Sequence, residues 1–261
     1  MLMVREWSVN MWALLHILCC MCLSYISIAT LALYIFCLFT FSLQRKSFKL
    51  QLLFSSGVIV SVLVWQYWSN FYGSPYFLGR YSDDYQYDSL WSGSYYSTYG
   101  VNPIHLYDHL GKLHNSVGYV YVVVILRWFG DLFDGYHTLL PRVLNIFFLT
   151  QIINMVTNII KSYSIGLDKW SSRLGIWFFF FPSMLFNSAH AFRDTIVSFL
   201  LLQILYVYRK HRYLGIYRLI MPLVMLFFLR KTVIVMLLVI IVLYHIVKYR
   251  QIWRFVLLSV L

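Results

Sequence analysis

Long apolar blocks separated by short polar stretches dominate this chain. Neither Lys, Arg, Asp nor Glu occurs from Ser8 to Gln44, and further apolar blocks cover about 50–70 and most of the chain after residue 138. A helix of about 20 apolar residues crosses the hydrocarbon core of a bilayer. The pattern therefore predicts an all-α, polytopic membrane bundle.

The spans follow from the apolar blocks. The block 8–44 fits one long tilted helix or two short ones, and the absence of Gly and Pro favours one. Residues 1–49 are then an extra N-terminal transmembrane segment with a basic cytoplasmic turn, and 50–261 form the main transmembrane module. Because the chain stops at Leu261 inside an apolar run, we expect a truncated or unusually small member of its class. The later spans are predicted at about 50–70, 139–160, 174–191, 195–208, 214–229 and 232–247, with kinks expected at Gly175, Pro182 and Pro222.

Residues 71–137 differ from the rest, because they hold six of the nine acidic residues and only three basic ones. We expect a long first loop on the outer face. Within it, the apolar run 117–129 is about a dozen residues long, which as a helix reaches about 18 Å, short of the roughly 30 Å core. This run is therefore predicted to be a re-entrant or surface-lying helix.

Composition and charge support the membrane prediction. Of the 261 residues 61% are hydrophobic and only 11% are charged, which excludes an ordinary soluble domain. Thirteen of the 21 basic residues fall in the four segments 45–49, 161–173, 209–218 and 248–254, which contain a single acid. The positive-inside rule places these segments in the cytoplasm. They therefore explain the net charge of +12 without nucleic-acid binding.

The pair Arg193–Asp194 sets the topology of the later spans. A single helix over 174–208 would place both charges near the bilayer centre, where each costs about 2.5–3.5 kcal/mol. A hairpin with the pair at the outer surface is favoured.

On this topology, acids and cations gather at the outer face. Asp83 and Asp84 are candidate catalytic bases, since a carboxylate can take a proton from an acceptor hydroxyl, and two adjacent carboxylates can raise one pKa. Arginines can hold a phosphate in a bidentate manner and stabilise its leaving charge. The candidate phosphate-binding residues are Arg142, Arg193, Arg230 and Lys231. Each cation can equally be interpreted as a side chain at a helix end that extends its charge into water. The two acids can equally be interpreted as part of a solvated loop.

Neither cysteines nor histidines form a recognisable ligand set. The four cysteines lie in the first apolar block, where thiols are usually inert packing groups. His105, His109 and His114 share the outer loop without a compact ligand motif. No cofactor is predicted, and a divalent metal is left open.

A series of segments in a fixed order adds a family resemblance over about 50–250. These segments are "SDDYQYDSLWSG" (82–93), "HNSVGYVYVVVILRWFGD" (114–131), "LLPRVLNIFFLTQIINMVTNII" (139–160), "FFPSMLFNSAHAFRDTIVSFLLLQILYVYRK" (180–210) and "LFFLRKTVIVMLLVII" (226–241). The series resembles the C-type membrane glycosyltransferase superfamily, in the branch of the protein mannosyltransferases and lipopolysaccharide-core transferases.

The resemblance implies a polyprenyl-phosphate-sugar donor and inverting transfer at the outer leaflet. It assigns the catalytic base to Asp83 or Asp84, and the start of a surface helix to His114 to Tyr119, where Asn115–Ser116 replaces the usual prolines. It also assigns Arg142 with Asn145 to a helix start, the pair Arg193–Asp194 to a position before the next helix, and Arg230, followed here by Lys231, to the opening of a later span.

The leading hypothesis is an integral-membrane glycosyltransferase of a bacterial inner or plasma membrane, which moves a hexose or pentose from a polyprenyl phosphate to a glycan, lipid or protein acceptor. Two alternatives stay open. A polymerase of the O-antigen or exopolysaccharide type would depend on outer-face arginines more than on an acidic pair. A non-catalytic scaffold or transporter component would carry charges at mid-bilayer.

Overall fold

In the computed structural model, every regular element among the described residues is a helix, as the apolar pattern predicts. The described residues are 2–43, 48–77, 79, 82–110, 117–163, 168–191, 193–211, 216–240 and 242–243. The long helices are α1 (Leu2–Ile26), α2 (Ile28–Leu43), α3 (Phe48–Tyr72), α8 (Leu139–Tyr163), α9 (Asp168–Phe179), α11 (Asp194–His211), α12 (Ile216–Leu229) and the helix Lys231–Ile240.

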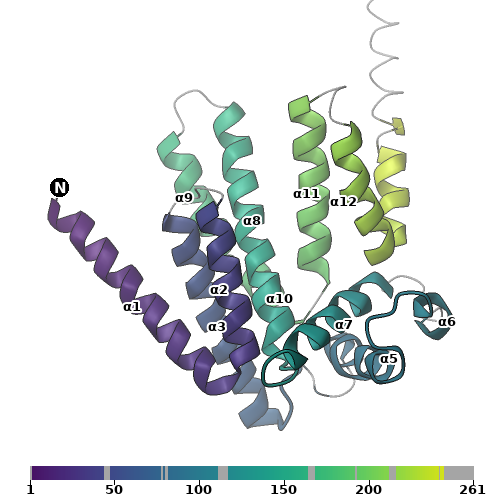
Figure 1. The fold of residues 1–261 in the computed structure, drawn as a ribbon. Coiled ribbons are helices and arrows are strands. Elements are labelled where there is room, and N and C mark those ends of the chain that lie inside the picture. Colours follow the sequence, from purple (N-terminus) through teal and green to yellow (C-terminus); the bar gives the residue numbers. More distant parts are fainter. Residues whose placement is uncertain are drawn as a thin grey trace, which may run out of the picture.

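The long helices run side by side as a bundle, with reversals at both ends (Figure 1). In the bundle, α8 packs against α3, α9 and α11, and α11 packs against α12. One apolar core joins α1, α2, α3, α8 and α9, and a second joins α7 (Val117–Asp131), α11 and α12. Two of the described helices, Phe48–Tyr72 and the part Leu139–Lys161 of α8, are long and apolar enough to cross a membrane, a test that a buried core helix can also pass.

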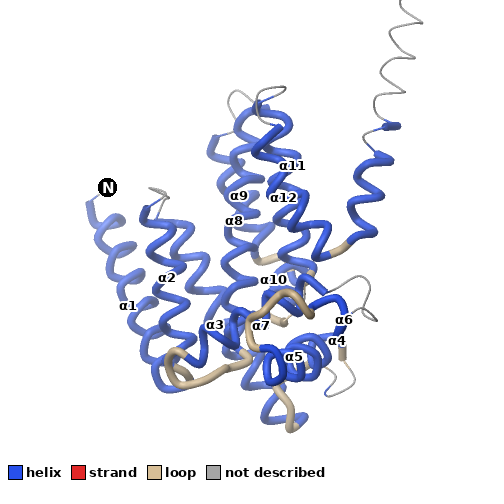
Figure 2. The backbone as a smooth tube through the Cα atoms, turned by 45° about the vertical axis from the view of Figure 1, so that its right-hand side comes forward, coloured by secondary structure: helices blue, strands red, loops and turns tan. Residues whose placement is uncertain are grey.

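The acidic segment 71–137 forms a layer of short helices at one end of the bundle (Figure 2). Its elements are α4 (Asp83–Tyr85), the π-helical η2 (Gln86–Trp91), α5 (Ser92–Tyr99), α6 (Leu106–Leu110) and α7. The helix α7 lies across the ends of the long helices (Figure 1), so the short helix predicted for 117–129 is confirmed and does not run along the bundle. A Cβ at Gly118 would come within 2.6 Å of the Phe228 backbone, so only glycine permits this close approach of α7 to α12.

The single helix favoured for 8–44 is wrong, because the chain breaks at Ser27 into α1 and α2. The Ser27 hydroxyl accepts the Thr30 N–H at 3.3 Å, as expected of an N-cap. The carboxylate of Asp134, more than 100 residues away, accepts the N–H groups of Ile28 at 2.6 Å and Ala29 at 2.9 Å. The break therefore depends on a tertiary contact that replaces the local signal of Gly or Pro.

The span predicted for 174–191 is also wrong as one helix, since it divides into α9 and α10 (Pro182–Ser188). Phe181 is extended before Pro182, which takes the first position of α10. A proline without an N–H cannot continue the preceding helix but suits the first turn of a new one. Pro182 therefore separates two helices instead of kinking one. Pro222 lies inside α12. Arg193 precedes α11 and Asp194 begins it, so the predicted break between two helices at this pair is confirmed.

Replacing Asp134 by Ala should destabilise the fold by about 1 kcal/mol, the typical cost of losing a helix cap. Although partial burial opposes it, hydrogen bonding from Ala29, Ile28 and Ser27 lowers the pKa of Asp134 below its usual value. The cap therefore stabilises the fold above about pH 4 and is lost as the pH falls through the lowered pKa.

Thermal unfolding of the detergent-solubilised chain, followed by circular dichroism, measures this effect. The difference in melting temperature between wild type and Asp134→Ala should be clear at pH 7 and should become smaller below pH 4. Asp108→Asn, which removes an exposed acid of the same segment, is the control. Equal melting of wild type and Asp134→Ala at pH 7 would contradict the capping role.

Candidate functional site

The turn 189–191 between α10 and α11 is held by side chains from three other elements. The Ala191 N–H donates to Asp84 of α4 at 2.8 Å, and the Ala191 carbonyl accepts the Tyr119 hydroxyl of α7 at 2.6 Å. The Asn145 amide of α8 donates to the His190 carbonyl at 2.8 Å. Since buried backbone groups require partners, these bonds fix the turn against both the layer of short helices and the bundle.

A buried ion pair lies beside this turn. Asp84 and Arg142 are both fully buried, with 3.7 Å between a carboxylate oxygen and a guanidinium nitrogen. Arg142 also donates to the carbonyls of Pro75 and Ala189. Burial raises the pKa of Asp84, and the positive charge of Arg142 and the Ala191 N–H partly offset this. The pair thus joins the loop before α4 to the start of α8.

A second buried carboxylate, Asp88, lies one helical turn along from Asp84. Asp88 is fully buried and accepts a hydrogen bond from the Tyr136 hydroxyl. Burial and the like charge of Asp84 raise the pKa of Asp88 to about 7, against the opposing effect of Arg127 and Arg142. Arg127 donates to the Asp88 carbonyl at 2.6 Å. Asp88 is not among the site residues predicted from the sequence. Its spacing of four residues from Asp84 is the signal that the two carboxylates lie on the same face of a helix.

Asp83 lies differently from its neighbour. It is exposed at the first position of α4, and the Ser82 hydroxyl caps the helix by accepting the Tyr85 N–H at 3.2 Å. An anionic side chain is favoured at a helix N-terminus. Of the two acids predicted as catalytic, Asp84 is therefore an internal anchor, whereas Asp83 is accessible to a substrate.

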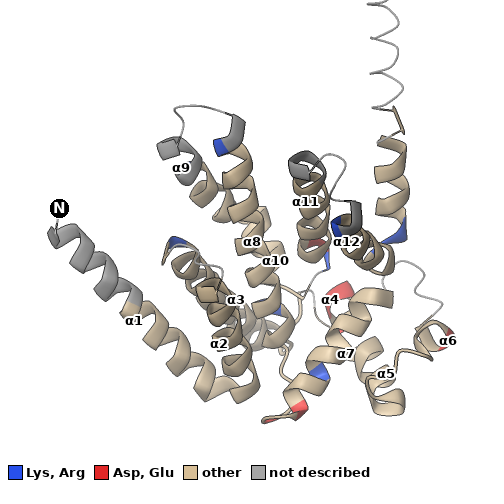
Figure 3. Ribbon diagram, turned by 45° about the horizontal axis from the view of Figure 1, so that its top comes forward, with Lys and Arg blue, Asp and Glu red and all other residues tan. Residues whose placement is uncertain are grey.

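Three of the four predicted cations contact side chains of the acidic segment 71–137: Arg142 contacts Asp84, Arg193 contacts Tyr87 and Lys231 contacts Tyr107. Figure 3 marks the basic residues in blue and the acidic residues in red along the ribbon. Arg193 is half-buried and donates to the Tyr87 hydroxyl at 3.0 Å, with its guanidinium carbon 5.2 Å from the centre of the Tyr87 ring. Arg230 pairs with Asp194 at 2.7 Å on the surface. Lys231 lies 5.3 Å from the centre of the Tyr107 ring. Arg193 is thus next to the acidic segment, and Arg230 and Lys231 follow at the end of α12.

The remaining predicted site residues are placed as follows. Tyr119 is fully buried and binds the turn through its hydroxyl, and His114 lies outside the described residues. Among the described His, Cys, Asp and Glu side chains, no group of three comes together as a metal site would require.

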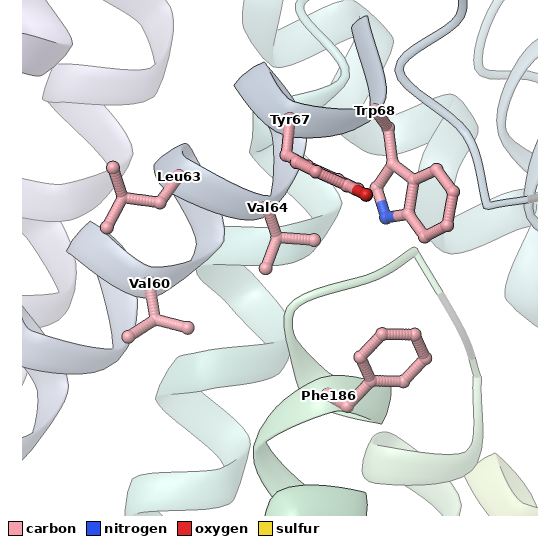
Figure 4. Close-up of a pocket in the computed structure, with 6 residues that line it drawn as sticks. All are labelled: Val60, Leu63, Val64, Tyr67, Trp68 and Phe186. Atoms are coloured by element: carbon pink, nitrogen blue, oxygen red, sulfur yellow. The ribbon is translucent and has the colours of Figure 1, made fainter. Parts of the chain in front are cut away.

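An apolar groove of about 370 Å³ runs between α3 and α10 toward the turn (Figure 4). Its lining residues are Val60, Leu63, Val64, Tyr67, Trp68 and Phe186. The rings of Trp68 and Phe186 lie 6.2 and 4.3 Å from that of His190, centre to centre. Burial and the charge of Arg142 lower the pKa of His190 to about 4, so this ring is neutral at pH 7. The groove therefore leads from the apolar side of the bundle to the turn that Asp84 holds.

Replacing Asp84 by Asn should strongly destabilise the fold, because it leaves the buried Arg142 guanidinium without its ion-pair partner. Breaking a buried ion pair from one side costs about 3–5 kcal/mol. The double variant Asp84→Asn/Arg142→Gln should recover part of this loss, since neither charge is then buried alone. Denaturant unfolding of the two single variants and the double variant measures the coupling, and strictly additive effects would contradict it.

Stability should also depend on Asp88 between about pH 4 and pH 7. Because the pKa of Asp88 is raised, the folded chain keeps a proton that the unfolded chain has lost. The stabilisation from protonated Asp88 is therefore full below about pH 4 and declines as the pH rises to about 7. Asp88→Asn keeps a hydrogen-bond acceptor for Tyr136 and removes the titration. Melting temperatures across this range should therefore fall in wild type and change less in Asp88→Asn. Parallel pH profiles would contradict this assignment.

Comparison with known proteins adds no identification. The chain matches no protein-family model, no curated protein and no solved structure. Function is therefore argued from the geometry of this site.

Proposed function

We propose that this protein is a multi-pass membrane glycosyltransferase that moves a sugar from a polyprenyl phosphate to a glycan, lipid or protein acceptor. The observation that carries the proposal is the different placement of two adjacent acids. Asp83 is exposed and accessible, while Asp84 is buried against Arg142 and fixes the segment that presents Asp83. An enzyme site needs such a reactive group on a rigid support.

The surface of the long helices supports a membrane location. Large apolar side chains are exposed on α2, α12 and the helix Lys231–Ile240, and on α12 these are Ile220, Met221, Val224, Met225, Phe227 and Phe228. Apolar patches of this extent are unusual on a soluble monomer, whereas lipid would cover them. The last turn of α8 and the first turn of α12 lie at the end of the bundle opposite α7 (Figure 1), and these turns carry Lys161 and Arg218. This separation agrees with a cytoplasmic basic end and an outer acidic end.

The groove between α3 and α10 supports a lipid-linked donor. Its walls are almost entirely hydrocarbon and aromatic rings, and it ends at the turn 189–191. An isoprenoid chain in this groove would bring the attached phosphate to the outer end of the bundle. There Arg193, Arg230 and Lys231 supply the positive charge that a sugar phosphate requires.

In the proposed reaction, the Asp83 carboxylate accepts the proton of the acceptor hydroxyl as its oxygen forms a bond to the anomeric carbon. The bond from that carbon to the phosphate oxygen breaks, and the polyprenyl phosphate leaves with the electron pair. Arg193 stabilises the negative charge that develops on the leaving phosphate. Asp84 contributes by position, because it is buried and bonded to the turn.

Replacing Asp83 by Asn should lower transfer at least 100-fold, the lower range for loss of a general base, and leave the melting temperature unchanged because the side chain is exposed. The assay follows radiolabelled mannose, glucose or arabinose from a polyprenyl phosphate into the non-lipid fraction of membranes that express the chain. Asp108→Asn is the matched control, since it removes an exposed acid of the same outer segment.

Full activity in Asp83→Asn would remove the proposed mechanism. Activity that survives in Asp83→Asn but is lost in Arg193→Gln would favour the polymerase alternative. No transfer from any of the three donors by the wild-type chain, under conditions where it is folded, would count against a transferase of these sugars.

A further inference from the structure

A second groove, distinct from the one described above, lies between α8, α11 and α12. It has a volume of about 460 Å³, and most of its lining is apolar, including Phe148, Phe199, Val207 and Met221. Two polar side chains also line it, Gln203 of α11 and Arg218 of α12. The site proposed for sugar transfer does not use this groove.

The groove extends along α11 from Ile196 to Val207, which at 1.5 Å per residue is roughly 16 Å. This length is about half the thickness of a bilayer core, so it matches the acyl chains of one leaflet. Because α11 starts at the outer end with Asp194 and α12 starts at the opposite end with Ile216, Arg218 marks the inner end of the groove.

Charge identifies which lipid fits. Arg218 is exposed and ends a segment, 209–218, that contains four of the chain's basic residues and no acid. Basic pockets between helices on the cytoplasmic side bind anionic headgroups, and each Lys or Arg near the surface adds to the attraction. Gln203 adds a polar group within the groove for the ester region of a lipid.

We propose that this groove binds an anionic glycerophospholipid of the inner leaflet, with its acyl chain along α11 and its phosphate at Arg218. The proposal rests on the membrane location argued above and is independent of the chemistry at Asp83. A lipid seated here joins α8, α11 and α12 along the groove, where protein side chains leave an opening.

The binding experiment uses the purified full chain in detergent and native mass spectrometry, with phosphatidylglycerol and phosphatidylcholine of the same acyl chains as probes. Wild type should retain phosphatidylglycerol in preference to phosphatidylcholine. Arg218→Gln should weaken phosphatidylglycerol binding about fivefold, the change that corresponds to about 1 kcal/mol for one basic residue. Lys161→Gln, which removes a positive charge from the same end of the bundle outside this groove, should have a smaller effect.

A second pair of variants tests the acyl-chain part. Met221 is 70% exposed and lines the groove, so tryptophan there would occupy the groove without overpacking a core. Met221→Trp should reduce the binding of both lipids. Ile220→Trp should not, because Ile220, the preceding residue of α12, is also exposed but does not line the groove. Asp83→Asn should bind lipid as wild type does, which separates this proposal from the catalytic one.

Several outcomes would overturn the site. These are equal retention of the two lipids by wild type, equal losses in Arg218→Gln and Lys161→Gln, or unchanged binding in Met221→Trp. Absence of lipid binding by folded wild-type chain would do the same.

Discussion

The buried ion pair between Asp84 and Arg142 is the contact on which one end of the molecule, the end that carries the layer of short helices, depends. Desolvation of both charges is costly, and their mutual attraction offsets that cost only with further hydrogen bonds. Those bonds come from the Ala191 N–H to Asp84, and from Arg142 to the carbonyls of Pro75 and Ala189. One pair thereby fixes the loop after α3, the short helix α4, the start of α8 and the turn before α11.

This arrangement explains how a short helix such as α4 holds a defined position. Three residues of helix have little stability of their own, because a helix nucleus is unfavourable in isolation. Asp84 anchors α4 through its ion pair with Arg142, and the buried Ser82 hydroxyl caps the start of the helix. The exposed Asp83 is consequently presented on a backbone that cannot readily move, as catalysis by a positioned carboxylate requires. The same rigidity would serve the proposed transfer, in which base, acceptor and donor phosphate must meet.

The two grooves lie at different places in the bundle and lead to different polar groups. The groove at Trp68 and Phe186 leads to the turn and its polar network, whereas the groove along α11 leads to a basic end. Apolar walls in both suit hydrocarbon chains, so the charged groups at their ends decide which headgroup each accepts. The helix α11 borders the second groove over most of its length and begins just after the turn to which the first groove leads.

The sequence alone determined the helical class, the short helix at 117–129 and the start of a new helix at Arg193–Asp194, and it singled out Asp84 and Arg142, which the structure pairs. These features follow from local properties: apolar run length, charge in an apolar context and the chemistry of single side chains. The family resemblance seen in the motif series stays a prediction, and the glycosyltransferase function stays a proposal. Tertiary structure decided the rest. The break at Ser27 depends on Asp134, the coupling of Asp84 to Asp88 and Arg142 depends on burial, and the difference between Asp83 and Asp84 depends on which side of α4 meets the bundle. These three features depend on contacts between segments that are distant in the chain, or on the burial that such contacts cause. The order of residues does not show which distant segments meet.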